Sequence, residues 1–262
     1  MTGGIEFRDA VVQLGGFRLV TGTAHAQAGR VTVLIGVNGS GKSTALRAAA
    51  GLLRPVSGAV LAGGKPVCEM AAGRRAARIA FVPQRFEVGA PFTVREVVQL
   101  GHAVGEPDAS GVARAMADTG VAPLADRPFH ALSGGQQQRV VVARALAQHR
   151  PGGILLLDEA FAAVDPAEAA GLVGAIRGLA ARGSTILVAT HDLALASALG
   201  DDAWFLERGQ SRGFGPADEL LRAGPLGRFL GVAVAEAATA RGAIAAADYG
   251  AMLPRSSKCA AN

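Results

Sequence analysis

The feature that most constrains this chain is a glycine-rich loop between an apolar run and a helical pattern. Residues 36–44 read GVNGSGKST and directly follow the apolar segment 31–35. Glycines let backbone N–H groups converge on an anion, and the helix that follows points its positive end at the same place. A lysine adds a compact charge for terminal phosphates, and a serine hydroxyl suits Mg²⁺. The pattern therefore predicts a nucleotide-phosphate site formed by Gly36, Asn38, Gly39, Ser40, Gly41, Lys42, Ser43 and Thr44.

Short apolar runs alternate with helical patterns along the chain, which indicates a parallel sheet built from βαβ units. We expect strands at 31–35, 79–82, 154–157, 185–189 and 203–206. We expect helices at 42–52, 94–102, 111–119, 134–147, 166–181 and 193–199. Residues 83–131 hold helical patterns but no convincing strand, so this stretch is interpreted as a helical insertion in an α/β core.

A second group of candidate residues follows the apolar strand 154–157, which reads ILLL. The strand ends in Asp158 and Glu159, and in α/β proteins ligands bind at the carboxyl ends of strands. Asp158 is expected to hold Mg²⁺ through water, and Glu159 to orient or deprotonate an attacking water. Without the phosphate loop, the same residues would be interpreted as a solvated acidic turn.

A third motif, LSGGQQQR at residues 132–139, opens a predicted helix. Ser133 can cap this helix, while Gly134 and Gly135 permit close backbone approach. The motif is thus a second anion-binding helix start in one chain.

These motifs, in this order, resemble the nucleotide-binding subunit of ATP-binding cassette (ABC) transporters. The resemblance covers about residues 5–221 and includes VPQ at 82–84, AAVD at 162–165 and VATHD at 188–192. It implies an α/β fold: a P-loop NTPase core with a parallel sheet, N-terminal antiparallel strands and a helical insertion. The expected domains are an ABC ATPase domain over 1–223, with a helical subdomain at about 84–147, and an Ala/Gly-rich tail over 224–262.

The resemblance also implies roles and partners. It implies a Mg²⁺-dependent ATPase that binds ATP and works as a head-to-tail dimer of two copies. Each ATP then lies between the phosphate loop of one copy and Ser133, Gly134, Gly135 and Gln136 of the other. Gln84 is assigned to Mg²⁺ and water sensing, His191 to the γ-phosphate and Asp165 to contact between the copies. An integral membrane permease at the cytoplasmic face of the membrane, and indirectly an extracytoplasmic substrate-binding protein, complete the system.

The cargo is inferred from resemblance alone. The stretch from VPQR at 82–85 to FTVREVV at 92–98 looks like the cassettes of zinc and manganese importers. Cassettes for ferric siderophores, haem and cobalamin carry nearly the same stretch and form the alternative. A soluble Fe–S assembly ATPase is a third reading. The family commonly stacks an aromatic ring on adenine, and here that position falls near Leu14, with Phe17 as a substitute.

Composition excludes several other classes of protein. The two cysteines, Cys68 and Cys259, lie far apart, and the five histidines show no ligand spacing, which argues against a disulfide scaffold or a zinc cluster. The N-terminus does not look like a signal peptide, and no apolar window is long enough to span a membrane. The formal charge is +5, but all but three of the 26 basic residues are dispersed arginines, so no nucleic-acid binding is expected.

Residues 232–247 are expected to form a helix or to lack regular structure.

Overall fold

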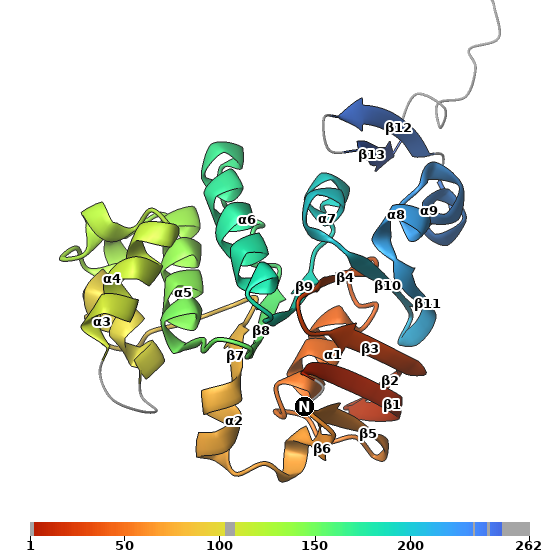
Figure 1. The fold of residues 1–262 in the computed structure, drawn as a ribbon, viewed down its shortest axis with the longest axis horizontal. Coiled ribbons are helices and arrows are strands. Elements are labelled where there is room, and N and C mark those ends of the chain that lie inside the picture. The colour runs from red at the N-terminus through yellow and green to blue at the C-terminus, as the bar shows by residue number, and fades with distance from the viewer. Residues whose placement is uncertain (1–2, 103–107, 233, 240–241, 248–262) are drawn as a thin grey trace, which may run out of the picture.

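The computed structural model describes residues 3–102, 108–232, 234–239 and 242–247. Tyr249, Lys258, Cys259 and the last part of the predicted tail lie outside the described residues. The chain forms a sheet in which half of the neighbouring strand pairs are not consecutive in sequence (Figure 1). The order is β6-β5-β1-β2-β11-β10-β4-β9-β8-β7, with β3 paired to β1 beside this path. The strands of this sheet are β1 (Gly4–Leu14), β2 (Phe17–Val20), β3 (Thr23–Gln27), β4 (Val31–Ile35), β5 (Ser57–Ala62), β6 (Lys65–Pro66), β7 (Ile79–Val82), β8 (Ile154–Asp158), β9 (Thr185–Ala189), β10 (Asp202–Glu207) and β11 (Gln210–Pro216).

The sheet has a parallel and an antiparallel part. Strands β10, β4, β9, β8 and β7 pair in parallel, while β1 pairs antiparallel with β2, β3 and β5. This confirms the predicted α/β fold with N-terminal antiparallel strands. The five strands predicted from apolar runs all form, and three of them have the predicted bounds.

Helices cover both faces of the parallel strands. The side chains of each strand alternate between these faces and therefore belong to two different cores. Val33 and Ile35 of β4 belong to a core shared with the later helices, whereas Leu34 belongs to a second core shared with α1 and the N-terminal strands. The helices are α1 (Lys42–Ala49), α2 (Ala72–Arg78), α3 (Val94–Gln99), α4 (Ala109–Asp118), α5 (Gly134–Gln148), α6 (Pro166–Ala181), α7 (Leu193–Leu199), α8 (Ala217–Leu220) and α9 (Ala223–Leu230).

Helices α3, α4 and α5 pack together beside the sheet, in the region expected to be a helical insertion (Figure 1). The apolar side chains of this region are mainly core: Val94, Val97 and Val98 are fully buried. Phe86 and Phe92 are only partly buried and pack against the same core. The predicted helix at 94–102 is shorter than expected, since α3 ends at Gln99 and a 3₁₀ turn follows.

The C-terminal part differs from the sequence-based expectation. The predicted tail begins with α9, whose Leu226 is fully buried and whose Phe229 stacks on Phe205 of β10 at 4.2 Å between ring centroids. The helix considered for 232–247 is wrong: β12 (Val234–Thr239) and β13 (Gly242–Ala247) form an antiparallel pair, and β13 packs on α7. Strand pairing and packing have overridden the helix propensity of an alanine-rich segment.

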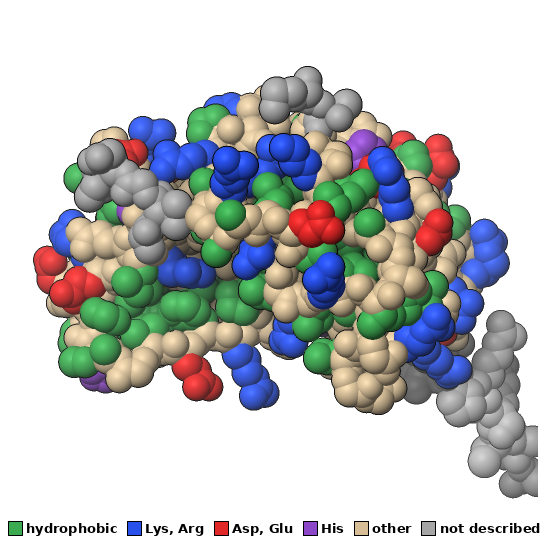
Figure 2. Space-filling view, turned by 90° about the horizontal axis from the view of Figure 1, so that it is seen from below, with side chains coloured by type: hydrophobic (Ala, Val, Ile, Leu, Met, Phe, Trp, Pro, Cys, Tyr) green, Lys and Arg blue, Asp and Glu red, His purple; other side chains and the backbone are tan. Residues whose placement is uncertain are grey.

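The surface carries its arginines in separated positions. On the face shown in Figure 2, Lys and Arg side chains lie among acidic and hydrophobic ones and form no continuous band. Among the described residues, no helix is long and apolar enough to cross a membrane.

Candidate functional site

Three of the predicted motifs meet because their strands are neighbours in the sheet. Strand β9 lies between β4 and β8 and runs parallel to both. The carboxyl ends of parallel strands lie at the same edge. The loop after β4, the acidic pair at the end of β8 and the segment after β9 are therefore brought together.

The phosphate loop is built by close backbone packing. Gly36 approaches the carbonyl oxygen of Leu206 and the Ser40 hydroxyl so closely that a Cβ atom would not fit. Gly41 has φ 113°, a conformation that favours glycine, and helix α1 begins at the next residue. The sequence of glycines thus lets the loop curl over the N-terminus of α1, where N–H groups point outward.

The loop lines a cleft of about 260 Å³. Its far wall includes Leu14 and Phe17, the two residues considered for adenine contact, together with Gln84 and Glu159. The phosphate-loop residues in the lining are Asn38, Gly39, Ser40, Gly41, Lys42, Ser43 and Thr44. A cleft with this lining has one apolar end and one end rich in hydrogen-bond donors.

Lys42 connects the loop to the acidic pair. Its Nζ donates to the carbonyl oxygen of Gly36 at 2.7 Å and lies 3.7 Å from Glu159 Oε1. Both side chains are more than nine-tenths buried. A buried carboxylate needs such a partner, because an unpaired one would lose its hydration without compensation.

Glu159 also orients His191. Its Oε2 lies 2.8 Å from His191 Nδ1. A carboxylate can only accept, so Nδ1 carries the proton and Nε2 is left for another partner. The imidazole is 65% exposed, and His191 touches the cleft through Glu159 without lining it itself.

Asp158 and Ser43 form the oxygen-rich part of the cleft. The Ser43 hydroxyl donates to Asp158 Oδ1 at 2.9 Å, and Oδ2 is buried with no hydrogen-bond partner among the described residues. Burial raises the pKa of Asp158, although the bond from Ser43 opposes the shift. An orphaned carboxylate oxygen beside a hydroxyl matches the hard oxygen donors that Mg²⁺ prefers, so these two residues fit the ion.

The third motif lies apart from this cleft. Ser133 and Gln136 form a reciprocal capping box at the start of α5. Gly135 packs against the carbonyl oxygen of Ala163, two residues before Asp165, which caps α6 by accepting from Ala167 N at 2.9 Å. None of Ser133, Gly134, Gly135, Gln136 and Asp165 lines the phosphate-loop cleft.

One residue pair was not predicted. Arg139 of α5 makes an ion pair with Glu168 of α6 at 2.6 Å and also donates to the carbonyl oxygens of Thr119 and Gly120. It ties the helix that starts at Ser133 to the helix capped by Asp165. Arg139 lies within the LSGGQQQR motif, but nothing in the sequence indicates that its partner is 29 residues further on.

The comparisons with known proteins identify the family. The sequence profile of a family described as ABC transporter matches residues 22–162 of this chain. The chain belongs to the ABC transporter family. It is therefore an ATP-binding subunit whose ATP hydrolysis is coupled to transport, in agreement with the order of motifs and the lysine-bearing loop.

Relatives of this ABC subunit include hemin import ATP-binding proteins. The HmuV protein of Streptomyces coelicolor is 41% identical over 222 residues, which cover 82% of this chain and 79% of the relative. HmuV of Pseudomonas aeruginosa is 39% identical over 79% of this chain and 84% of the relative. The cobalamin import ATP-binding protein BtuD of Halobacterium salinarum is 41% identical over 73% of this chain, but over only 50% of its own length.

A solved structure supports the fold. A chain of an inward-facing ABC transporter assigned to the metal-chelate type superposes with a TM-score of 0.78 at 22% identity. The match covers 97% of this chain and 100% of that one. The relatives named above are hemin and cobalamin import proteins, so the expected likeness to zinc and manganese cassettes is not confirmed.

Proposed function

We propose that this chain is the ATPase subunit of an importer for a metal-bearing tetrapyrrole of the haem or cobalamin type. The observation that carries the proposal is the 41% identity to the hemin import protein of Streptomyces coelicolor across 82% of the chain. It belongs to the alternative class of importer that the sequence stretch at 92–98 also allowed, beside zinc and manganese importers. The cassette does not need metal ligands of its own, and no cluster of three or more potential metal ligands exists among the described residues.

In this function, the phosphate loop binds the phosphates of ATP through its N–H groups and Lys42. The Lys42 ammonium has three donors, and its bonds to the loop carbonyls hold it at the base of the cleft. Ser43 and Asp158 would hold Mg²⁺, which supplies charge neutralisation on the β- and γ-phosphates. Phosphoryl transfer requires little covalent chemistry from the protein, so positioning and charge stabilisation dominate.

Glu159 is the residue that acts on the attacking water. It is held by Lys42 and His191, with Gln84 lining the same cleft. A carboxylate so placed can orient water and accept its proton. His191 would contact the γ-phosphate through Nε2, since Nδ1 is bonded to the carboxylate.

The complete site requires a second copy of the chain. Ser133, Gly134, Gly135 and Gln136 begin a helix that is suited to an anion but lies outside the cleft. In a head-to-tail dimer, this helix start closes the nucleotide site of the partner, and Asp165 contacts it. The dimer works on a membrane permease at the cytoplasmic face of the membrane, which is supplied by an extracytoplasmic substrate-binding protein.

The cargo is tested by growth of the host cell without this chain. We expect a growth defect with hemin as the iron source, and we expect it to be corrected by the wild-type chain but not by Glu159→Gln. Growth under zinc or manganese limitation is the control and should stay unchanged. A defect confined to zinc or manganese limitation would return the assignment to the other class of importer.

A further inference from the structure

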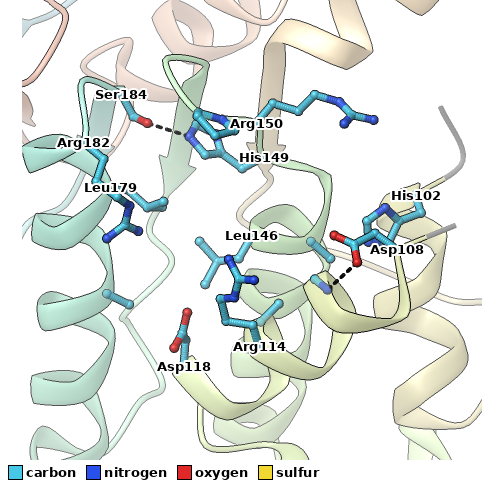
Figure 3. Close-up of a pocket in the computed structure, with 15 residues that line it drawn as sticks. His102, Asp108, Arg114, Asp118, Leu146, His149, Arg150, Leu179, Arg182 and Ser184 are labelled. Atoms are coloured by element: carbon cyan, nitrogen blue, oxygen red, sulfur yellow. Dashed lines mark hydrogen bonds between the residues drawn. The ribbon is translucent and has the colours of Figure 1, made fainter. Parts of the chain in front are cut away.

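A second cavity, of about 320 Å³, lies between helix α6, which covers the sheet, and the helical unit that α3, α4 and α5 form (Figure 3). Helix α4 and the end of α5 form one side, and α6 with the residues that follow it forms the other. The cavity shares no lining residue with the nucleotide cleft. Its size is at the lower end of the range of small-molecule sites in proteins, about 300–1,000 Å³.

The charged lining of this cavity is rich in arginine. Arg114, Arg150 and Arg182 line it together with two carboxylates, Asp108 and Asp118. Asp108 already accepts from the Ser110 hydroxyl and from the N–H of Gly111, because it caps α4. Asp118 is therefore the one carboxylate of the lining that is not engaged in this helix cap.

Two of these arginines point into the cavity from opposite walls. Figure 3 shows the Arg114 and Arg182 side chains directed toward its centre, whereas Arg150 extends away from it. The guanidiniums of Arg114 and Arg182 make no hydrogen bond or ion pair with the residues that the structure describes. Each keeps its full set of N–H donors for an oxyanion, and a guanidinium binds carboxylate or phosphate oxygens in pairs.

The rest of the lining suits a compact organic body rather than an ion alone. Leu146 and Leu179 supply apolar surface, and His149 is bonded to Ser184 with 2.8 Å between Nε2 and Oγ. Burial and the nearby charge of Arg182 lower the pKa of His149 to about 4, so this wall is neutral at pH 7. A ligand would meet cationic groups on two sides and a neutral, partly apolar surface between them.

We propose that this cavity binds a small organic dianion, a phosphate monoester or a dicarboxylate, with Arg114 and Arg182 as its main contacts. Such a ligand would join α4 to the end of α6, and so the helical unit to the sheet. Asp118, one helical turn after Arg114, is the side chain that opposes anion binding and limits its strength.

The test is calorimetric titration of the full chain, with the nucleotide cleft saturated by MgADP. Glycerol 3-phosphate and succinate are the two probes. We expect one or both to bind, and Arg114→Gln and Arg182→Gln each to weaken binding by about tenfold, the usual scale for losing a charged hydrogen-bond partner. Asp118→Asn should strengthen it several-fold. Arg54→Gln, the same charge change at an exposed residue outside the cavity, should leave it unchanged.

Each outcome bears on the proposal. Binding of glycerol 3-phosphate alone identifies a phosphate ligand, and binding of succinate alone a dicarboxylate. The proposal is overturned if neither probe binds, or if the two arginine variants bind as tightly as Arg54→Gln. All three arginines that are changed are exposed, so loss of folding should not obscure the result. A thermal midpoint measured for each variant checks this directly.

Discussion

At the scale of single residues, Glu159 is the most constrained side chain of the nucleotide cleft. Its backbone has φ 52°, an uncommon conformation for a residue other than glycine, and its N–H donates to the carbonyl oxygen of Ala189 at 3.0 Å. Contacts with Lys42 and His191 fix both carboxylate oxygens. Strain of this kind persists only where the surroundings hold the residue in place, and it is concentrated at functional sites.

The first prediction concerns the chemistry of this carboxylate. Glu159→Gln keeps the size of the side chain but removes the base, so we expect ATP hydrolysis to fall about 10²–10⁴-fold. ATP binding should remain, because the phosphate loop is intact. Phosphate release and nucleotide binding measured on the same preparation separate the two effects. Glu219→Gln, far along the chain in α8, is the control; equal hydrolysis by wild type and Glu159→Gln would remove Glu159 from its role.

A second prediction at this scale concerns His149 and pH. Its pKa is lowered from 6.5 to about 4 by burial and by the charge of Arg182. Between these two values the unfolded chain binds the proton and the folded chain does not, so this group's contribution to stability is full above pH 6.5 and is lost as the pH falls to about 4. The loss is on the order of 2–3 kcal/mol.

Denaturant unfolding at pH 7 and at pH 4.5 measures this contribution. His149→Gln should lose less stability between the two pH values than the wild type, since glutamine does not titrate. His130→Gln, at an exposed histidine, should behave like the wild type. Identical pH dependence of wild type and His149→Gln would contradict the burial argument.

At the scale of elements, the start of α5 depends on its contact with the segment before α6. A Cβ added at Gly135 would collide with the carbonyl oxygen of Ala163, whereas one at Gly134 would meet nothing within 4 Å. Two adjacent glycines in one motif are therefore under different constraints. The contact also explains how the motif at 132–139 and the segment around Asp165 come to lie together.

This difference gives a prediction with a matched control. Gly135→Ala should destabilise the chain by about 1–3 kcal/mol, because α5 and the 162–165 segment must separate. Gly134→Ala should be neutral or slightly stabilising, since alanine is the better helix former. Thermal or denaturant unfolding of the two variants measures both. Equal midpoints would show that the contact with Ala163 does not constrain the helix.

Helix α9 changes the expected boundary of the folded unit. The sequence suggested that the ATPase domain ends at 223, yet Leu226 is fully buried and belongs to the core of the later helices. The glycine and alanine content of the whole tail hid this, although Leu226, Phe229 and Leu230 have the spacing of one helix face. From the burial of this leucine we infer that the folded unit continues past residue 223.

We therefore expect Leu226→Ala to cost about 2–5 kcal/mol of stability, as is usual for a leucine removed from a packed core. Arg228→Ala, on the same helix but exposed, should cost less than about 0.5 kcal/mol. Unfolding of both variants at one pH is sufficient. A Leu226→Ala variant as stable as the wild type would mean that α9 is only loosely attached.

At the scale of the whole molecule, the two helix starts that we propose for nucleotide binding do not share a cleft in one chain. The lining that contains Lys42 contains no residue of the motif at 132–139. The proposed head-to-tail pair of copies would account for this separation, since each copy would supply the half that the other lacks.

Mixing two inactive variants tests the pairing. Lys42→Ala damages the phosphate loop, and Ser133→Arg damages the other helix start, so neither variant alone has an intact site. In a mixed dimer one site combines the intact halves, so an equal mixture should recover about a quarter of wild-type ATP hydrolysis for random pairing. Capture of an untagged Ser133→Arg copy by a tagged Lys42→Ala copy is the control for exchange between dimers. No recovery in a mixture that exchanges would place the complete site within one chain.

The local parts of this protein can be predicted from the order of its residues. The phosphate loop, the acidic end of β8 and the capping box at Ser133 are contiguous patterns, so residue order alone defines their chemistry. The central strands were predictable for the same reason, since buried parallel strands are continuously apolar. The strands at the N-terminus and beyond residue 206 were harder to assign, because half-exposed strands carry a weaker pattern.

Which of these parts meet depends on how the strands and helices pack. Ser43 and Asp158 are 115 residues apart, and Glu159 and His191 are 32 apart, yet each pair is in hydrogen-bond contact. These contacts follow from the strand order β4-β9-β8, which is not the order of the chain. The arginine-lined cavity arises in the same way, from the packing of α4 against α6. Contacts between distant segments depend on how whole elements pack, and no local pattern of residues records that packing.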